Sequence, residues 1–206
     1  PVVVILAITC VVLMMAVFCP KSRSIYYVAQ LAVIAGIVLT FFQHKLLAKA
    51  TIIASSSLII DHLSAMSSIF ILVLSLFAFL YAKKELKRMK LAHGEYYGLC
   101  LFSILGMLLM ASAFNFITLY LSIELMSLPL YALCIYKRES GKSAEAAIKY
   151  FVTGALASGL MLYGLSLIFG ATQTINFSQI SMNLVDMSSS SNVLMLVGIA
   201  FVFAGF

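Results

Sequence analysis

Long apolar runs separated by short polar segments follow one another along almost the whole chain. The first six are long enough to cross a hydrocarbon layer about 30 Å thick, which needs about 20 apolar residues in a helix. The seventh stops at Phe206 and would reach only about 21 Å at 1.5 Å per residue. The pattern therefore predicts a polytopic bundle of about seven membrane helices. The runs cover about 2 to 19, 25 to 42, 63 to 82, 96 to 114, 116 to 136, 143 to 169 and 193 to 206.

Composition agrees with a membrane protein and excludes an ordinary soluble domain. The chain is 64% hydrophobic and only 10% charged, against about 25% charged residues in an average soluble domain. We expect residues 1 to 206 to form one all-α membrane domain, with 181 to 192 as an ordinary surface loop. Because the chain opens on Pro1 and stops within an apolar run, we also expect it to be a truncated piece of a larger domain.

Basic residues are distributed unevenly between the predicted loops. Three alternate loops hold ten Lys and Arg residues, whereas the intervening loops hold only Lys45 and Lys49. This bias predicts an N-terminus on the outside and basic loops on the cytoplasmic side. It also explains the net charge of +6 without a nucleic-acid partner. The segment KKELKRMK at 83 to 90 could instead dock on anionic lipid or protein. The ten residues are Lys21, Arg23, Lys83, Lys84, Lys87, Arg88, Lys90, Lys137, Arg138 and Lys142.

Residues able to bind metals are scattered through the sequence. The four cysteines lie singly in or beside apolar runs, and no CxxC or Cys/His spacing is present that would hold zinc or an iron–sulfur cluster. The three histidines fall in loops or at span edges, where we assign them no role. We therefore predict no metal, no bound cofactor and no catalytic residue on this chain. The residues concerned are Cys10, Cys19, Cys100, Cys134, His44, His62 and His93.

Glu124 lies near the middle of the fifth predicted span. An ionised carboxylate there costs several kcal/mol, so such a residue is usually functional, protonated or paired. Tyr120, Ser127 and Tyr131 stand four before, three after and seven after it, which places all four side chains on one helix face. This hydroxyl-lined stripe predicts a proton-relay face turned toward other helices. The alternative is a static network in which a protonated Glu124 only pins helices together.

Pro129 stands five residues after Glu124 in the same span. Proline has no N–H with which to satisfy the carbonyl of Leu125, so we expect a local kink or loosened turn beside the carboxylate. Prolines are tolerated in membrane helices, and this feature alone is weak evidence for a site. Its position next to Glu124 gives it weight.

Lys149 lies in the sixth span, for which Ser143 is the expected N-cap. One interpretation is structural, since Glu145 four residues earlier can pair with it and a lysine near the boundary can snorkel to the interface. In the other, the small residues at 154, 155, 158 and 159 pack against a neighbour while Lys149 faces the same interior as Glu124. The two backbones should differ in depth by roughly 9 Å at 1.5 Å per residue. Direct contact is therefore doubtful.

Two stretches around these residues resemble a known family. LYLSIELMSLPLYAL at 119 to 133 and EAAIKYFVTGALASGLMLYGLSLIFGATQTINF at 145 to 177 resemble subunit N of NADH:quinone oxidoreductase, respiratory complex I, whose mitochondrial counterpart is subunit 2. The resemblance is specific between about 114 and 177. It implies an antiporter-like proton-channel subunit in which Glu124 matches the essential glutamate of the fifth helix and Lys149 the lysine of the sixth.

This resemblance also implies where the rest of the machinery lies. NADH, FMN, iron–sulfur clusters and quinone would be bound by other subunits, and the partners would be other membrane-arm subunits and the lipid bilayer. The expected location is the bacterial inner membrane, or the mitochondrial inner membrane if the protein is organellar. The alternatives are a subunit of a multisubunit sodium/proton antiporter, which shares the buried acid and lysine, and a structural membrane scaffold.

Overall fold

The computed structural model describes residues 2–18, 23–46, 51–53, 57–88, 94–137, 140–183 and 189–206. Seven long helices coincide with the seven apolar runs, so the predicted all-α membrane bundle is confirmed; a short hairpin and a short helix were not predicted. In chain order the elements are α1 (Val2–Phe18), α2 (Arg23–Leu46), β1 (Thr51–Ile53), β2 (Leu58–Ile60), α3 (His62–Arg88), α4 (Glu95–Ala111), α5 (Phe116–Cys134), α6 (Gly141–Thr172), α7 (Phe177–Asn183) and α8 (Ser189–Gly205).

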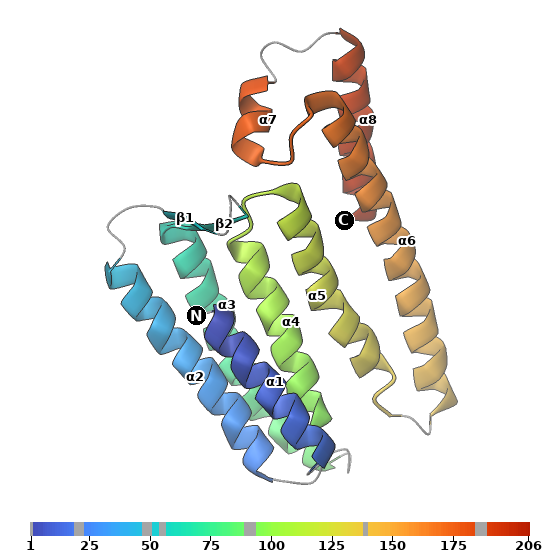
Figure 1. Cartoon of the computed structure of the whole chain (residues 1–206). Helices are drawn as coiled ribbons and strands as arrows, with labels where there is room; N and C mark the ends of the chain where they lie inside the picture. Colours follow the sequence, from blue (N-terminus) through green and yellow to red (C-terminus); the bar gives the residue numbers. More distant parts are fainter. Residues whose placement is uncertain are drawn as a thin grey trace.

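Helices α1 to α4 surround one apolar core (Figure 1). The side chains of Ile5, Leu72, Leu101 and Leu105 are buried almost completely in it, one from α1, one from α3 and two from α4. Helix α5 lies along α4, and α6 lies beyond α5 with α8 beside it. The molecule therefore consists of a broad bundle and a thinner helix pair, with α5 between them.

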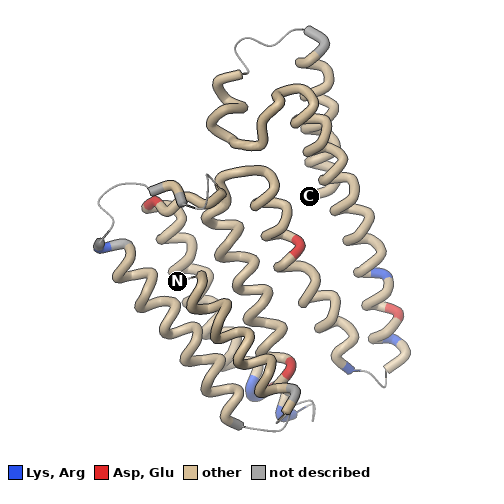
Figure 2. The backbone as a smooth tube through the Cα atoms, in the orientation of Figure 1, with Lys and Arg blue, Asp and Glu red and all other residues tan. Residues whose placement is uncertain are grey.

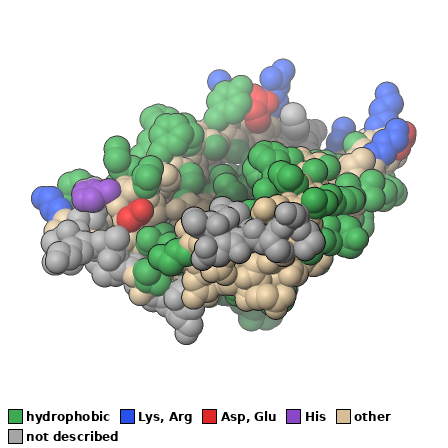
Figure 3. All heavy atoms as spheres, turned by 90° about the horizontal axis from the view of Figure 1, so that it is seen from above, with side chains coloured by type: hydrophobic (Ala, Val, Ile, Leu, Met, Phe, Trp, Pro, Cys, Tyr) green, Lys and Arg blue, Asp and Glu red, His purple; other side chains and the backbone are tan. Residues whose placement is uncertain are grey.

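The outside of both parts is apolar. Large hydrophobic side chains such as Phe70, Phe77 and Leu156 are more than half exposed, and Figure 3 shows hydrophobic side chains over much of the face seen from above. Helices α2, α3, α5 and α6 are long and apolar enough to cross a membrane, and α1, α4 and α8 are shorter apolar helices. An apolar surface over helices of this length belongs in lipid.

Backbone pairing at one end ties the two parts together. Strands β1 and β2 form an antiparallel hairpin in which Thr51 pairs with Ile60. The hairpin bonds to the α4–α5 connection, where the Phe114 N–H donates to the Ser57 carbonyl at 2.9 Å. The same connection bonds to the segment after α6, since the Phe116 N–H donates to the Ile175 carbonyl at 3.1 Å. These bonds satisfy backbone groups that leave the helices at this end.

Two local predictions need correction. Ser143 is not the N-cap of α6: the cap is Ser140, in extended backbone conformation, whose hydroxyl accepts from the Ser143 N–H. The Ser143 hydroxyl instead donates to the Cys134 carbonyl at 2.5 Å, which closes the α5–α6 turn. Residues 181 to 192 are not simply a surface loop, because 181–183 end α7 and 189–192 begin α8. Serine is favoured at helix N-termini. The helix therefore begins at Ser189, four residues before the apolar run that was used to predict it.

Basic residues gather at the opposite end from the hairpin. The last turns of α3 carry Lys83, Lys84, Lys87 and Arg88, so much of the basic segment continues a helix. The Lys83 ammonium lies 4.0 Å from the centre of the Tyr26 ring, in an aromatic cluster typical of a membrane boundary. Figure 2 shows most of the described charges near helix ends. The alternation of basic loops is therefore visible, while the sidedness of the membrane stays a prediction.

Candidate functional site

Helix α5 is held tightly against α4. A Cβ added to Gly106 would lie 2.5 Å from the Met126 nitrogen and 2.9 Å from the Ser122 carbonyl oxygen, so the two backbones meet there. Ser122 is only 1% exposed, and its hydroxyl donates to the Thr118 carbonyl at 2.6 Å. One face of α5 is thus fixed on the bundle. The other faces remain for α6 and for the predicted polar stripe.

The start of α5 is fixed by its cap. The Asn115 side chain accepts from the Thr118 N–H at 2.7 Å, which satisfies one of the otherwise unbonded amides of the first turn. Pro129 lies inside the helix, which is continuous from Phe116 to Cys134, and its side chain is buried. The lost bond to the Leu125 carbonyl therefore leaves a loosened turn rather than a break in α5.

Glu124 is the only acidic or basic residue in α5, and it is half-buried (Figure 2). The Tyr120 hydroxyl interacts with both the Glu124 carboxylate and the Ser158 hydroxyl of α6. The Ser127 hydroxyl donates to the Glu124 backbone carbonyl at 3.2 Å, and so does not serve the carboxylate. The polar contacts of the site therefore run from Glu124 through Tyr120 to α6.

Tyr131 provides the second contact between α5 and α6. A Cβ on Gly154 would collide with the Tyr131 hydroxyl, so a larger residue there would require the Tyr131 side chain to move. The ring also meets the rings of Tyr150, 4.9 Å away, and Phe151, 5.7 Å away, both edge to face. The predicted stripe thus faces a neighbouring helix at Tyr120 and Tyr131. The residues of α6 that this face meets are Gly154 and Ser158. They form one of two pairs of small residues spaced four apart in α6, and the other pair is Ala155 with Gly159.

The second small-residue pair behaves differently. Nothing in the described residues lies within 4 Å of a Cβ added to Gly159. The close contact of α6 is instead with α8, where a Cβ on Gly164 would lie 2.6 Å from the Gly198 carbonyl oxygen. Sequence reasoning missed this contact, although glycines within two apolar runs were the available signal.

Lys149 is bonded within its own helix. Its ammonium lies 2.6 Å from the Glu145 carboxylate, and the two side chains are 73% and 65% exposed. Five residues at about 100° each place Lys149 about 140° around the helix from Gly154. Because Gly154 faces α5, Lys149 lies on the far side of α6. Among the described residues, Lys149 therefore pairs with Glu145 and not with Glu124. This pairing is the first of the two alternatives that the sequence left open for Lys149.

No cluster of three or more metal-ligating side chains occurs in the part of the chain that the structure describes. Cys10, Cys100 and Cys134 are free thiols there, while Cys19 and His93 lie outside the described residues. The polar chemistry found at the α5–α6 contact is therefore that of a carboxylate with hydroxyl neighbours, which can bind and release protons.

These features define a class: a membrane helix bundle with a single acidic residue on the helix that joins its two parts. Residues 113–206 match the sequence profile of the membrane domain described as NADH:quinone oxidoreductase/Mrp antiporter. This part of the chain, a little under half of its length, is therefore similar to that family.

Curated relatives cover the whole chain. It is 36% identical over 208 residues to NADH-quinone oxidoreductase subunit N of Coxiella burnetii, and 38% identical over 207 residues to the subunit of that name from Halorhodospira halophila. The alignments include all of this chain but only 43% and 42% of those relatives. The chain thus spans less than half the length of the curated relatives that it matches.

Solved structures share the fold. The chain superposes on a subunit of respiratory complex I from Thermus thermophilus with a TM-score of 0.78, at 22% identity, covering 99% of this chain and 42% of that one. A subunit of an archaeal respiratory membrane complex, the membrane-bound sulfane sulfur reductase, gives 0.82 at 24% identity, with coverage of 99% and 42%. The helix arrangement is therefore common to several respiratory membrane complexes.

Proposed function

We propose that this chain forms part of a proton-translocating membrane-arm subunit of NADH:quinone oxidoreductase, with Glu124 as a proton-relay residue. The observation that carries the proposal is that Glu124, the only charged residue of α5, stands seven residues before Tyr131 on the face of α5 that meets α6 at Gly154, in a chain whose relatives are named subunit N. A lone carboxylate within an apolar helix is costly unless it is used, protonated or paired.

The proton step follows from the neighbours of Glu124. The protonated carboxyl group is neutral and compatible with an apolar setting. When the proton leaves, the Tyr120 hydroxyl can donate to the carboxylate, and charge-assisted hydrogen bonds of this kind are the stronger ones. The Ser158 hydroxyl extends the polar path to α6. Tyr131 has a different role, because its contact with Gly154 sets the distance between α5 and α6. The turn loosened by Pro129 allows the Glu124 side chain to change position when it gains or loses a proton.

Lys149 is the second relay group in this proposal. Its present partner, Glu145, is four residues away on the same helix and largely exposed. Pairs at that spacing contribute only about 0.3–0.5 kcal/mol, so a modest change in the surroundings is enough to release the ammonium. The released ammonium would give its proton to a neighbouring group, and the neutral amine that remains could accept the next proton. Because Lys149 lies on the side of α6 away from α5, exchange with Glu124 would run through intervening groups rather than by direct contact.

The proposed setting is a multisubunit complex in a bacterial inner membrane, or in the mitochondrial inner membrane if the protein is organellar. Other membrane-arm subunits and lipid are the expected partners. NADH, FMN, iron–sulfur clusters and quinone are expected on other subunits, so this chain would act in the enzyme without performing its redox steps. We further propose that residues 1 to 206 act as a single membrane domain.

The test is Glu124→Gln in the full-length subunit, assembled in the native complex. Glutamine keeps the shape and hydrogen bonding but does not titrate. We expect NADH-driven proton uptake by inverted vesicles to fall about tenfold, equal to about 1.4 kcal/mol of barrier. Glu124→Asp should retain part of the uptake. The matched control is Glu85→Gln, at the end of α3, where the carboxylate is paired only loosely with Arg88 at 3.8 Å.

Assembly is checked by whether the variant subunit purifies together with the NADH-oxidising subunits, and NADH oxidation is measured with quinone as the acceptor so that the intact complex is required. Full proton uptake by Glu124→Gln with normal NADH oxidation would contradict the relay role and favour a structural scaffold. Loss of both activities would indicate failed assembly, and Glu124→Asp would then decide between charge and packing.

A sodium/proton antiporter subunit is the second candidate, because the family description includes Mrp antiporters and an Mrp complex from Dietzia shares the fold, with a TM-score of 0.74 at 18% identity. Purification of the native assembly separates the two. A complex that exchanges sodium for protons and lacks NADH-oxidising subunits would replace our first proposal.

A further inference from the structure

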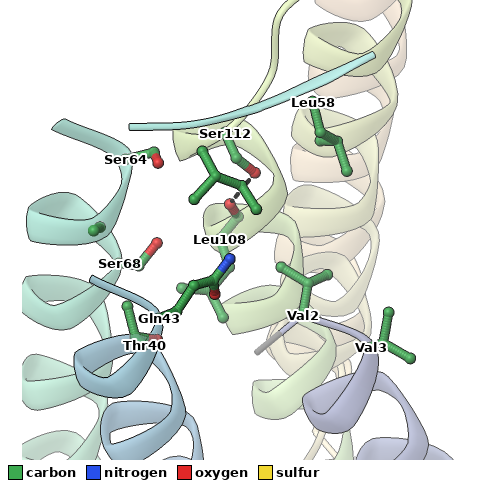
Figure 4. Close-up of a pocket in the computed structure, with 11 residues that line it drawn as sticks. Val2, Val3, Thr40, Gln43, Leu58, Ser64, Ser68, Leu108 and Ser112 are labelled. Atoms are coloured by element: carbon green, nitrogen blue, oxygen red, sulfur yellow. Dashed lines mark hydrogen bonds between the residues drawn. The ribbon is translucent and has the colours of Figure 1, made fainter. Parts of the chain in front are cut away.

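A cavity of about 200 Å³ lies at the hairpin end of the α1–α4 bundle, and its described lining residues come from neither α5 nor α6. Helices α1, α2, α3 and α4 and strand β2 line it (Figure 4). Its described hydrogen-bonding side chains come from α2, α3 and the residue that follows α4, and none of them is Asp, Glu, Lys or Arg. They are Thr40, Gln43, Ser64, Ser68 and Ser112.

Three of the hydroxyls already use their protons. Thr40 donates to the Gly36 carbonyl at 2.7 Å, Ser64 to the Asp61 carbonyl at 3.1 Å, and Ser112 to the Leu108 carbonyl at 3.0 Å. A hydroxyl oxygen has two acceptor lone pairs. The Ser64 oxygen also accepts from the Asp61 N–H at 3.1 Å, so Thr40 and Ser112 are the two that offer acceptors to an occupant of the cavity.

Ser68 and Gln43 differ from those three. Ser68 is only 8% exposed, its hydroxyl points toward the cavity in Figure 4, and no hydrogen-bond partner for it exists among the described residues. The Gln43 amide also lines the cavity but is only half-buried. Buried polar groups in native proteins are almost always bonded to protein or water, so Ser68 requires a partner from outside the described residues, and the Gln43 amide is placed to share that partner.

The opposite wall is apolar. Val2, Val3, Leu58 and Leu108 contribute hydrocarbon to it, and Val3 is 78% exposed, so this wall reaches the outer surface of the bundle. About six waters would fill the volume at about 30 Å³ each, but those beside Val2, Val3, Leu58 and Leu108 would face hydrocarbon. A molecule with one polar and one apolar end satisfies both walls.

We propose that this cavity binds a small, neutral, hydroxyl-bearing amphiphile, whose hydroxyl bonds to Ser68 and Gln43 while its hydrocarbon lies along Val2 and Val3. The lining residues that the structure describes carry no charge. Such a lining disfavours an ion or a charged head group, because a charge moved out of water needs a charged or multiply bonded partner. The inference does not depend on the proposed proton-relay function. It assigns a ligand to the opposite part of the fold from the α5–α6 contact.

The test uses photolabelling of the full-length subunit in its native membrane. The probe is a six-carbon alcohol carrying a diazirine, and its control is the matching diazirine alkane without the hydroxyl. We expect the alcohol to label peptides containing residues 40–43 or 64–68 about fivefold more than the alkane, as one net hydrogen bond implies. Excess unlabelled hexanol should abolish this labelling.

Variants locate the polar contact. Ser68→Ala and Gln43→Leu should each lower alcohol labelling severalfold without changing alkane labelling. Ser75→Ala is the matched control, because Ser75 is equally buried on α3 but donates to Ile71 and does not line the cavity. Equal labelling by both probes, undiminished labelling of Ser68→Ala, or no labelling of these peptides would each overturn the proposal. The last result would indicate a cavity filled by water or by another part of the protein.

Discussion

The α1–α4 bundle and the α6–α8 pair reach close packing by different means. The bundle buries large side chains, such as Ile5, Leu72 and Leu105, that are 1% exposed or less. In the pair, the backbones approach each other directly at Gly164 and Gly198. The hydrophobic effect contributes little to helix association in lipid, because lipid tails are as apolar as the helix surfaces. A two-helix unit therefore depends on close van der Waals contact at small residues. The comparison predicts that the pair tolerates added volume less well than the bundle.

Gly164→Ala should have the largest effect on folding. The new methyl would meet backbone atoms, the Gly198 carbonyl oxygen at 2.6 Å and the Val202 nitrogen at 2.7 Å, and backbone yields less readily than a side-chain tip. We expect a loss of about 2 kcal/mol or more, measured as the unfolding midpoint of the full-length subunit in detergent. Gly159→Ala is the control, because a methyl there meets nothing within 4 Å among the described residues. Equal effects of the two substitutions would refute close packing at Gly164.

Gly106→Ala should rank second. Its methyl would lie 2.5 Å from the Met126 nitrogen, but the broad core of the bundle offers more contacts through which the strain can spread. We expect a loss of about 1–2 kcal/mol by the same measurement, with Gly141→Ala as the control at an open position. A larger loss than that of Gly164→Ala would reverse the comparison between the two parts.

Gly154→Ala should act mainly on the site between the two parts. The obstacle is the end of the Tyr131 side chain, which can move, so we expect less than about 1 kcal/mol of destabilisation but reduced proton uptake as α6 shifts from α5. Tyr131→Phe removes the obstructing hydroxyl and should restore part of the uptake in the double variant. A double-mutant cycle without coupling would show that the two residues do not meet in the assembled protein.

Lys149→Met should have the smallest effect on stability. The pair with Glu145 is largely exposed, and pairs of this type contribute about 0.3–0.5 kcal/mol. The relay proposal nevertheless requires proton uptake to fall strongly, whereas a snorkelling lysine predicts little loss. Unchanged uptake with unchanged stability would remove Lys149 from the proposed relay and leave Glu124 unaffected.

The hydropathy pattern predicted most of the helices, whereas residue spacing predicted only some of the contacts at the site. The spacing of Tyr120 and Tyr131 around Glu124 correctly indicated a face turned toward another helix. The same spacing placed Ser127 on that face but did not identify its partner. The Ser127 hydroxyl bonds to the Glu124 backbone carbonyl, because serines in helices compete for nearby carbonyls. Periodicity fixes the face of a helix but not the acceptor that a short side chain selects.

The sequence by itself indicated that the helices lie in lipid, where the apolar helices run along the chain, and where the single acid of α5 stands. These features could be predicted because the length and apolar character of each segment are local properties. Only the tertiary structure decided which helix each face meets: Gly106 on α5, Gly154 beneath Tyr131, and Gly164 against α8. It also assembled the cavity from separate helices. These outcomes depend on fits of a few tenths of an ångström between segments distant in the chain, and no local pattern encodes such fits.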